Sequence, residues 1–174
     1  MSFGKRIAWL KDQKQKKSNL NKKIVLFDMD GTLTEPRGLF DLCLLSPLQN
    51  ILKKANIGIV TGSDHDYLIQ QMKPILDTKT FKSIHLLPCN GTKHYLPNGD
   101  DHKLVHSKCM KSELGELNFK NLMITLLNKQ TNIEHHTSPL PLTGHFISYR
   151  GSMINWCPIG RNANDKQRKY FKKF

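Results

Sequence analysis

Short apolar runs alternate with amphipathic stretches in the first part of the chain. Three runs of apolar residues occupy positions 24–27, 57–60 and 84–87, and their length and composition are typical of buried parallel strands. Two stretches between them, 39–56 and 64–76, carry apolar side chains at helical spacing. A strand–helix–strand–helix–strand order with short connections predicts a parallel α/β layer.

The pattern changes in the second part of the chain. Residues 96–101 are rich in turn formers, and residues 112–129 have the apolar spacing of an amphipathic helix. Residues 131–144 resemble a loop, whereas 145–150 and 153–157 are strand-like runs joined by a Gly-Ser pair, which predicts a hairpin. A lysine-rich helical stretch follows, so the second part is expected to be α+β and antiparallel.

Charge is concentrated at the two ends of the 174-residue chain, whose formal net charge is +13. Residues 1–23 hold eight Lys or Arg against one acid, and residues 161–174 hold six against one. Phe3, Ile7 and Leu10 also fall at helical spacing. The N-terminal stretch is therefore interpreted either as a solvated tail or as an anchor for nucleic acid or a membrane surface. Outside this tail, we expect no binding of nucleic acid.

Several classes of protein are excluded by composition. No apolar run approaches the ~20 residues that span a bilayer, and the lysine-rich N-terminus lacks the apolar region of a secretory signal. The four cysteines are far apart and form no C-x-x-C pair, so we expect reduced, mostly buried thiols. These features favour a cytoplasmic protein.

The sequence DMDGTLT follows the first apolar run directly. Ligands collect at the carboxyl ends of strands in open parallel sheets, so Asp28 and Asp30 are expected at such a site. Asp28 can attack phosphorus while Asp30 moves protons on the substrate oxygen, and Gly31 allows a tight turn. Two close carboxylates repel a phosphate unless a divalent cation is bound, which predicts Mg²⁺ on Asp28 and Asp30.

This motif resembles motif I of the haloacid dehalogenase superfamily, whose members use the first aspartate as a nucleophile, pass through an aspartyl-phosphate and bind Mg²⁺. The second apolar run ends in the sequence TGSD, in which Thr61 occupies the place of the phosphate-binding Ser or Thr of motif II.

Most of residues 24–174 resembles the eukaryotic-type phosphomannomutases. The segments that carry this resemblance are TEPR (34–37), GSD (62–64), PCNG (88–91), HFISYR (145–150), GSMINWCPIGR (151–161) and DKQR (165–168). The resemblance implies that Arg37, Thr61, Gly62 and Ser63 bind substrate.

Three arginines complete the sites that the resemblance implies. Arg150 ends one predicted strand, Arg161 follows its partner strand, and Arg168 lies on the next predicted helix. A hairpin followed by a helix could bring the three guanidinium groups together, and clustered arginines bind phosphate bidentately. We therefore expect them to hold the phosphate that lies remote from the nucleophile.

The expected fold is α/β: a HAD-like Rossmannoid parallel-sheet core with an inserted α+β cap. Residues 1–23 would form a basic extension, 24–105 the N-terminal part of the catalytic core, and 106–174 the N-terminal part of the cap. Relatives of this family continue further, so the chain is expected to be truncated at its C-terminus, with an incomplete cap and sheet.

The resemblance implies an enzyme that interconverts mannose 6-phosphate and mannose 1-phosphate for GDP-mannose synthesis and protein glycosylation. It also implies Mg²⁺, a hexose 1,6-bisphosphate activator and a homodimer formed through the cap. Two alternatives stay open: a sugar-phosphate phosphatase of the same superfamily, and a truncated homologue that acts as a binding protein without catalysis.

Overall fold

The computed structural model describes residues 23–133 and 140–173, and the chain divides into two compact units after Val105. The basic extension, except for Lys23, lies outside the described residues, as does part of the expected loop at 131–144. In the described part of the chain, no helix is long and apolar enough to cross a membrane.

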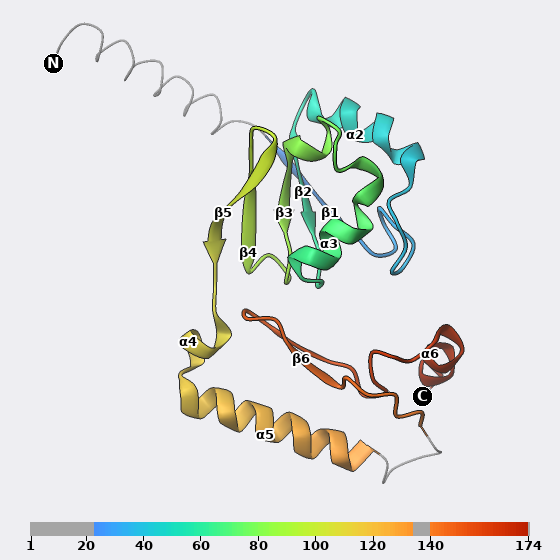
Figure 1. Ribbon diagram of the computed structural model, residues 1–174, viewed down its shortest axis with the longest axis vertical. Coiled ribbons are helices and arrows are strands. Elements are labelled where there is room, and N and C mark those ends of the chain that lie inside the picture. The colour runs from blue at the N-terminus through green and yellow to red at the C-terminus, as the bar shows by residue number, and fades with distance from the viewer. Residues whose placement is uncertain (1–22, 134–139, 174) are drawn as a thin grey trace, which may run out of the picture. The chain divides into compact units, whose positions relative to one another are not determined.

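A five-stranded sheet organises the first unit, with the strand order β1-β2-β3-β4-β5 (Figure 1). Its strands are β1 (Ile24–Asp28), β2 (Asn56–Val60), β3 (Ile84–Leu87), β4 (Lys93–Asn98) and β5 (Asp101–Ser107). β1, β2 and β3 are parallel, whereas β4 runs antiparallel to β3. The prediction of an α/β fold is confirmed, and the three predicted strands are present.

Two helices, α2 (Leu45–Leu52) and α3 (His65–Gln71), pack on one face of this sheet, as Figure 1 shows. They bury a core to which the sheet, α2 and α3 all contribute, including Leu48, Ile57, Ile59, Leu68, Ile84 and Leu86. Each buried side chain of this kind stabilises the fold by about 1.5–3 kcal/mol. The sheet thereby becomes a fixed frame for the loops at its carboxyl edge.

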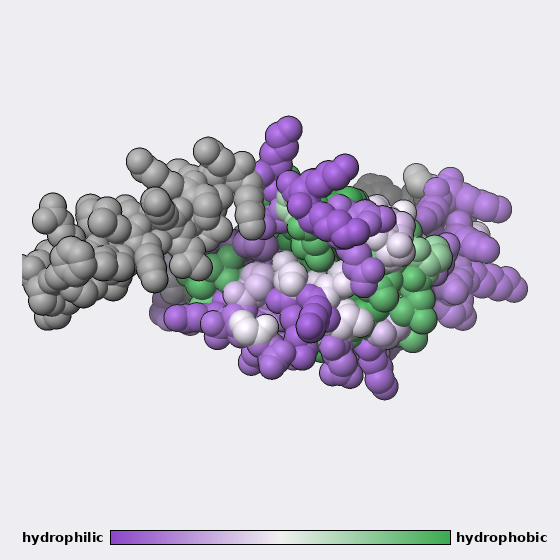
Figure 2. Space-filling model, turned by 90° about the horizontal axis from the view of Figure 1, so that it is seen from above, coloured by the Kyte–Doolittle hydropathy of each residue, from purple (hydrophilic) through white to green (hydrophobic). Residues whose placement is uncertain are grey.

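The opposite face of the sheet carries apolar side chains that reach the surface. Ile24 and Leu26, which alternate with Val25 and Phe27 along β1, are 49% and 54% exposed. Figure 2, which views the molecule from above, shows hydrophobic groups, in green, among polar side chains. Parallel sheets are usually covered on both faces, so this exposure is unusual.

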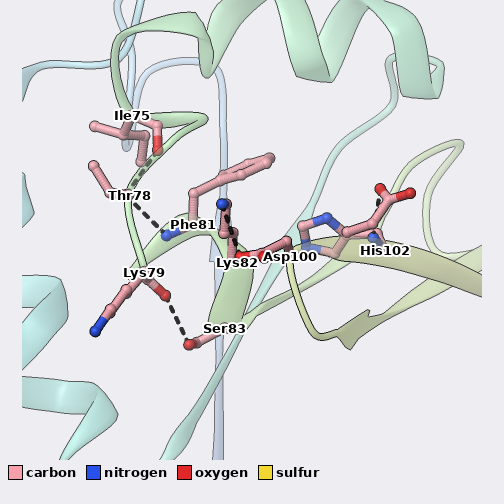
Figure 3. Close-up of polar contacts among 9 residues, drawn as sticks. Ile75, Thr78, Lys79, Phe81, Lys82, Ser83, Asp100 and His102 are labelled. Atoms are coloured by element: carbon pink, nitrogen blue, oxygen red, sulfur yellow. Dashed lines mark hydrogen bonds and ion pairs between the residues drawn. The ribbon is translucent and has the colours of Figure 1, made fainter.

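The connection from α3 to β3 is held by side chains that bond to the backbone (Figure 3). The Thr78 hydroxyl donates to the Ile75 carbonyl at 2.7 Å and accepts from the Phe81 N–H at 3.1 Å. Lys82 forms an ion pair with Asp100 at 3.0 Å and so joins this connection to the β4–β5 turn.

Two expectations for the first unit need correction. The turn-rich segment 96–101 contains a turn, but it joins β4 to β5, two antiparallel strands that the sequence pattern did not predict. The sheet is therefore mixed rather than purely parallel. The helix expected over 64–76 ends at Gln71 and continues as a short 3-10 turn, since Pro74 lacks the N–H that an α-helix requires.

The second unit combines three helices with one hairpin. These elements are α4 (Met110–Leu114), α5 (Glu116–Asn132), β6 (Ile147–Tyr149), β7 (Ile154–Trp156) and α6 (Asp165–Phe171). β6 and β7 pair antiparallel, as predicted. The single helix expected over 112–129 is two helices, because Gly115 adopts a φ of 76° that breaks the helix.

The cysteines are free, as expected of reduced thiols, but they are not mostly buried. Cys89 is buried and Cys157 is half-buried, whereas Cys43 and Cys109 are exposed. Cys109 precedes α4, where hydrogen bonds from Ser112 and then Tyr149 lower the pKa of its thiol to about 7.

A histidine pair makes the stability of the first unit sensitive to pH. His85 Nδ1 lies 3.1 Å from His94 Nε2, and burial, followed by repulsion from His94 and His102, lowers the pKa of His85. Because the unfolded chain then binds more protons than the folded one, stability should fall as the pH drops through about 6.5, the ordinary value for histidine.

Urea unfolding at pH 7.5, 6.5 and 5.5 measures this effect. We expect His85→Gln to lose less stability on acidification than the wild type, because the residue no longer titrates. His106→Gln, an exposed histidine outside the pair, is the matched control and should keep the wild-type slope. Equal slopes for His85→Gln and the wild type would contradict the assignment.

Candidate active site

Asp28 is the last residue of β1, where its register partner is Val60 of β2. Val60 in turn pairs with Leu87 of β3, so these three strands end at one edge of the sheet. Neighbouring strands lie roughly 4.8 Å apart, which places Thr61, directly after β2, beside the end of β1. Asp28 and Thr61, which are far apart in the sequence, therefore lie at the same edge of the sheet.

The loop after β1 is closed on the carbonyl of Met29. This carbonyl accepts hydrogen bonds from the N–H groups of Leu33 and Thr34 at 3.0 Å and from the Thr34 hydroxyl at 3.2 Å. Gly31, with a φ of 83°, provides the left-handed turn that lets its N–H reach the Thr34 carbonyl at 2.7 Å. Met29, which lies between Asp28 and Asp30, is fully buried, so its side chain fixes this part of the loop to the core.

Asp30 is fixed through one of its carboxylate oxygens. Oδ1 accepts from the backbone N–H of Arg37 at 2.9 Å and from the Nε2 of Gln71 at 3.0 Å. Hydrogen bonds to an ionised carboxylate are stronger than neutral ones, so they set the orientation of this side chain.

Gln71 is a residue of this site that the sequence reasoning missed. Its amide also donates to the Gly38 carbonyl at 3.0 Å and to the Thr34 hydroxyl at 3.3 Å, and the residue is 2% exposed. Its Oε1 is buried with no hydrogen-bond partner among the described residues. The available signal was a polar residue within the apolar stripe of the helix predicted over 64–76.

Replacing Gln71 with Met should loosen the loop that carries Asp30. The variant keeps the side-chain volume but removes the donor, and we expect it to cost about 1–2 kcal/mol of the free energy of unfolding, because Asp30 and Gly38 lose a buried partner. Gln70→Met, at the exposed neighbouring position, is the control and should change stability by less than about 0.5 kcal/mol. Urea titration measures both, and equal effects would refute this role.

Arg37 lies in the same loop with a strained backbone. Its φ of 64° is a left-handed value that costs a non-glycine residue on the order of 1 kcal/mol, which the bond from its N–H to Asp30 helps to offset. This hydrogen bond links the backbone of Arg37 to the carboxylate of Asp30. The structure thus places Arg37 in the same loop as the two aspartates.

The turns after β2 and β3 are joined by two backbone hydrogen bonds. The N–H of Cys89 donates to the Ser63 carbonyl, and the N–H of Asn90 donates to the Thr61 carbonyl, both at 2.8 Å. Thr61 is almost fully buried, and its hydroxyl accepts from the Ser63 N–H at 3.1 Å. Gly62 is exposed between them.

Of the three predicted clamp arginines, Arg168 contacts the backbone of Arg161 in the second unit. The Arg168 guanidinium donates to the Arg161 carbonyl at 2.7 Å and to the Ala163 carbonyl at 2.9 Å. The Arg161 N–H donates to the Gly144 carbonyl at the open end of the hairpin. Arg150 lies at the opposite end, where its N–H closes the turn onto the Met153 carbonyl at 2.9 Å.

The donor set at the end of β1 fits a hard divalent cation. Mg²⁺ binds one or two carboxylates and completes its shell with water and substrate phosphate oxygens. Asp28 is exposed at the strand end and Asp30 is half-buried beside it. Among residues 23–133 and 140–173, no group of three or more His, Cys, Asp and Glu side chains is arranged to hold a metal ion.

This frame and its loops can be compared with known proteins. The family model for eukaryotic phosphomannomutase matches residues 44–174, so the chain belongs to that family. It is 33% identical over 152 residues to a phosphomannomutase of Glycine max, and 35% identical over 151 residues to one of Encephalitozoon cuniculi. These alignments cover 87% and 86% of this chain but 57% and 54% of the relatives, so the chain spans little more than half of their length.

A solved structure shares the fold at lower sequence identity. The Plasmodium falciparum IMP-nucleotidase aligns with a TM-score of 0.55 and 18% identity. The alignment covers 76% of this chain and 38% of the nucleotidase. At this identity the likeness concerns the fold alone.

Proposed function

We propose that this chain carries the phosphoryl-transfer residues of a phosphomannomutase that interconverts mannose 6-phosphate and mannose 1-phosphate. Membership of the family supports the substrate, and the observation that carries the proposal is the position of Asp28. It ends β1 at the sheet edge that also presents Thr61, above a loop that orients Asp30.

The chemistry divides between the two aspartates. With Asp28 carrying a phosphoryl group, a free hydroxyl of the sugar phosphate attacks this phosphorus, the bond from phosphorus to Asp28 breaks, and the Asp30 carboxylate takes the hydroxyl proton. After the sugar turns around, the freed carboxylate of Asp28 attacks the other phosphate, the bond from phosphorus to the sugar oxygen breaks, and Asp30 returns the proton to that oxygen. Thr61, Gly62, Ser63 and Arg37 would bind the reacting phosphate.

Asp28 and Asp30 would hold Mg²⁺, which screens their charge from the incoming phosphate. Residues 24–105 would act as the core and 106–174 as the cap, where Arg150, Arg161 and Arg168 would bind the remote phosphate. Because Arg150 lies at the turn of the hairpin and Arg161 at its open end, this role requires the Arg150 side chain to reach back along the hairpin. The Arg168 guanidinium is held by the backbone carbonyls of Arg161 and Ala163, which keeps the two arginine positions close in the chain's second unit.

The cellular context follows from this activity as part of the same proposal. A hexose 1,6-bisphosphate would prime Asp28, and the product would supply GDP-mannose in the cytoplasm. A homodimer would form through the cap, and no part of the chain other than the basic extension would bind nucleic acid.

Product analysis of the full chain tests the proposal. The chain would be incubated with mannose 1-phosphate, Mg²⁺ and a hexose 1,6-bisphosphate, and ³¹P NMR would follow the phosphate. The proposal expects mannose 6-phosphate. Release of inorganic phosphate alone would indicate a phosphatase instead, and no turnover would reject both activities for this chain.

A further inference from the structure

Strained backbone conformations gather at the edge of the sheet that carries the candidate site. Among the described residues, four that are not glycine have a positive φ: Arg37 (64°), Cys89 (53°), Asn90 (57°) and His145 (52°). Arg37 follows β1, and the consecutive residues Cys89 and Asn90 follow β3. A left-handed backbone is unfavourable for residues with a Cβ atom, although asparagine tolerates it better than most, and it persists only where other contacts hold it.

The turn after β3, residues 88–91, is held firmly in this conformation. The Cys89 carbonyl accepts from the Thr92 hydroxyl at 2.6 Å, and the Gly91 N–H donates to the Leu87 carbonyl at 3.2 Å. Cys89 is fully buried. Because β3 lies between β2 and β4 in the sheet and the turn is bonded to it, the turn is a rigid support for the loops beside it.

The turn after β3 sets the orientation of a peptide group in the candidate site. The hydrogen bond from the Asn90 N–H to the Thr61 carbonyl, at 2.8 Å, fixes the peptide that joins Thr61 to Gly62. In a trans peptide the carbonyl and the following N–H point in opposite directions, and the described residues contain no cis peptide. The Thr61 carbonyl faces the turn after β3, so the Gly62 N–H faces the other way. In the strand order β1-β2-β3 this is the side of β1, which ends in Asp28 (Figure 1).

We propose that Asn90 is a positioning residue, which orients the turn at 61–63 for binding phosphate. Its left-handed backbone places the N–H that holds the Thr61 carbonyl, and this bond keeps the Gly62 N–H on the side of the reacting phosphate. A donor that is already oriented needs no reorganisation when the phosphate arrives. This role rests on the proposed function and adds to it a residue from the end of β3.

Two substitutions separate the backbone of Asn90 from its side chain, whose Oδ1 would lie 3.3 Å from a Cβ atom on Gly62. Asn90→Gly removes the side chain but adopts a positive φ readily, whereas Asn90→Val makes a positive φ strongly unfavourable. Both variants keep the backbone N–H. Their comparison therefore changes the preferred conformation of the donor and leaves the donor itself in place.

Titration of the ¹⁵N-labelled full chain with inorganic phosphate, in the presence of Mg²⁺, measures the effect at the amide signal of Gly62. We expect Asn90→Gly to bind phosphate within about twofold of the wild type. Asn90→Val should bind it roughly tenfold more weakly, because the Gly62 N–H is no longer held in place. His145→Val is the matched control, because it places the same strain, at a φ of 52°, in the second unit, and it should keep the wild-type affinity.

Circular dichroism verifies the fold of each variant. Asn90→Ala disfavours a positive φ less than valine does, so it replaces Asn90→Val if that variant unfolds, and it should weaken binding in the same direction. Wild-type affinity in the strained variant would overturn the proposal, and so would an equal loss in Asn90→Gly, because the side chain would then be the group that matters. Both outcomes leave the proposed function standing. A Gly62 amide that does not respond to phosphate in the wild type would overturn the proposed function together with this role.

Discussion

Replacing Asp28 with Asn should lower phosphomannomutase turnover by roughly 10⁴-fold or more, because the amide lacks the anionic oxygen that attacks phosphorus. The substitution is nearly isosteric at an exposed strand end, so the fold should be unaffected. Turnover of mannose 1-phosphate with Mg²⁺ and a hexose 1,6-bisphosphate is the measurement.

Asp77→Asn provides the control for this experiment. Asp77 is also an exposed carboxylate of the first unit, but it lies outside the loops at the carboxyl edge of the sheet. Its replacement changes the net charge equally and should leave turnover within about twofold of the wild type. Residual activity of the Asp28 variant at the level of this control would remove Asp28 from the role of nucleophile.

Gly160→Ala should have the largest effect on the stability of the second unit. Gly160 has a φ of 88°, and a Cβ atom there would lie 2.6 Å from Thr143 Oγ1 and 2.7 Å from the Gly144 nitrogen, and would also collide with the Gly144 carbonyl. The collision forces residues 143–144 away and breaks the bond from the Arg161 N–H to Gly144. We expect a loss of about 3 kcal/mol or more, with hydrogen exchange at the Arg161 amide as the readout.

Gly151→Ala separates the collision from the backbone cost. Gly151 has a similar φ of 81°, but no heavy atom lies within 4 Å of its added Cβ atom. This variant should therefore lose only about 1 kcal/mol, and it should keep the Arg161 amide protected. Similar losses in both variants would show that the contact at Gly160 does not hold the turn together.

The fold could be predicted from sequence where the local pattern and the tertiary environment agree. β1, β2 and β3 are apolar runs because one face of each packs in the core beneath α2 and α3, while the other face also carries apolar side chains, such as Leu26, Val60 and Leu87. β4 and β5 carry mostly polar or half-buried residues, and β4 even contains Pro97, so their pairing depends on contacts that no local pattern records. The break at Gly115 depends likewise on a backbone conformation that a helical spacing does not exclude.

The candidate site was predictable at the level of motifs. Asp28, Asp30 and Thr61 follow apolar runs, and the topology of parallel strands alone places such residues at one edge. The contact of Gln71 with Asp30 joins positions that are 41 residues apart, and it depends on how α3 packs over the loop after β1. The separation of Arg150 from Arg161 likewise follows from the hairpin, whose turn and open end carry one arginine each.

Phosphorylation of Asp28 tests the central claim most directly. The full chain would be incubated with Mg²⁺ and a hexose 1,6-bisphosphate, the acyl phosphate would be reduced with borohydride, and the peptide that contains Asp28 would be analysed by mass spectrometry. We predict conversion of Asp28 to homoserine in the wild type, with Asp30 unmodified and no conversion in Asp28→Asn. An unmodified Asp28 in the folded wild-type chain would contradict the account.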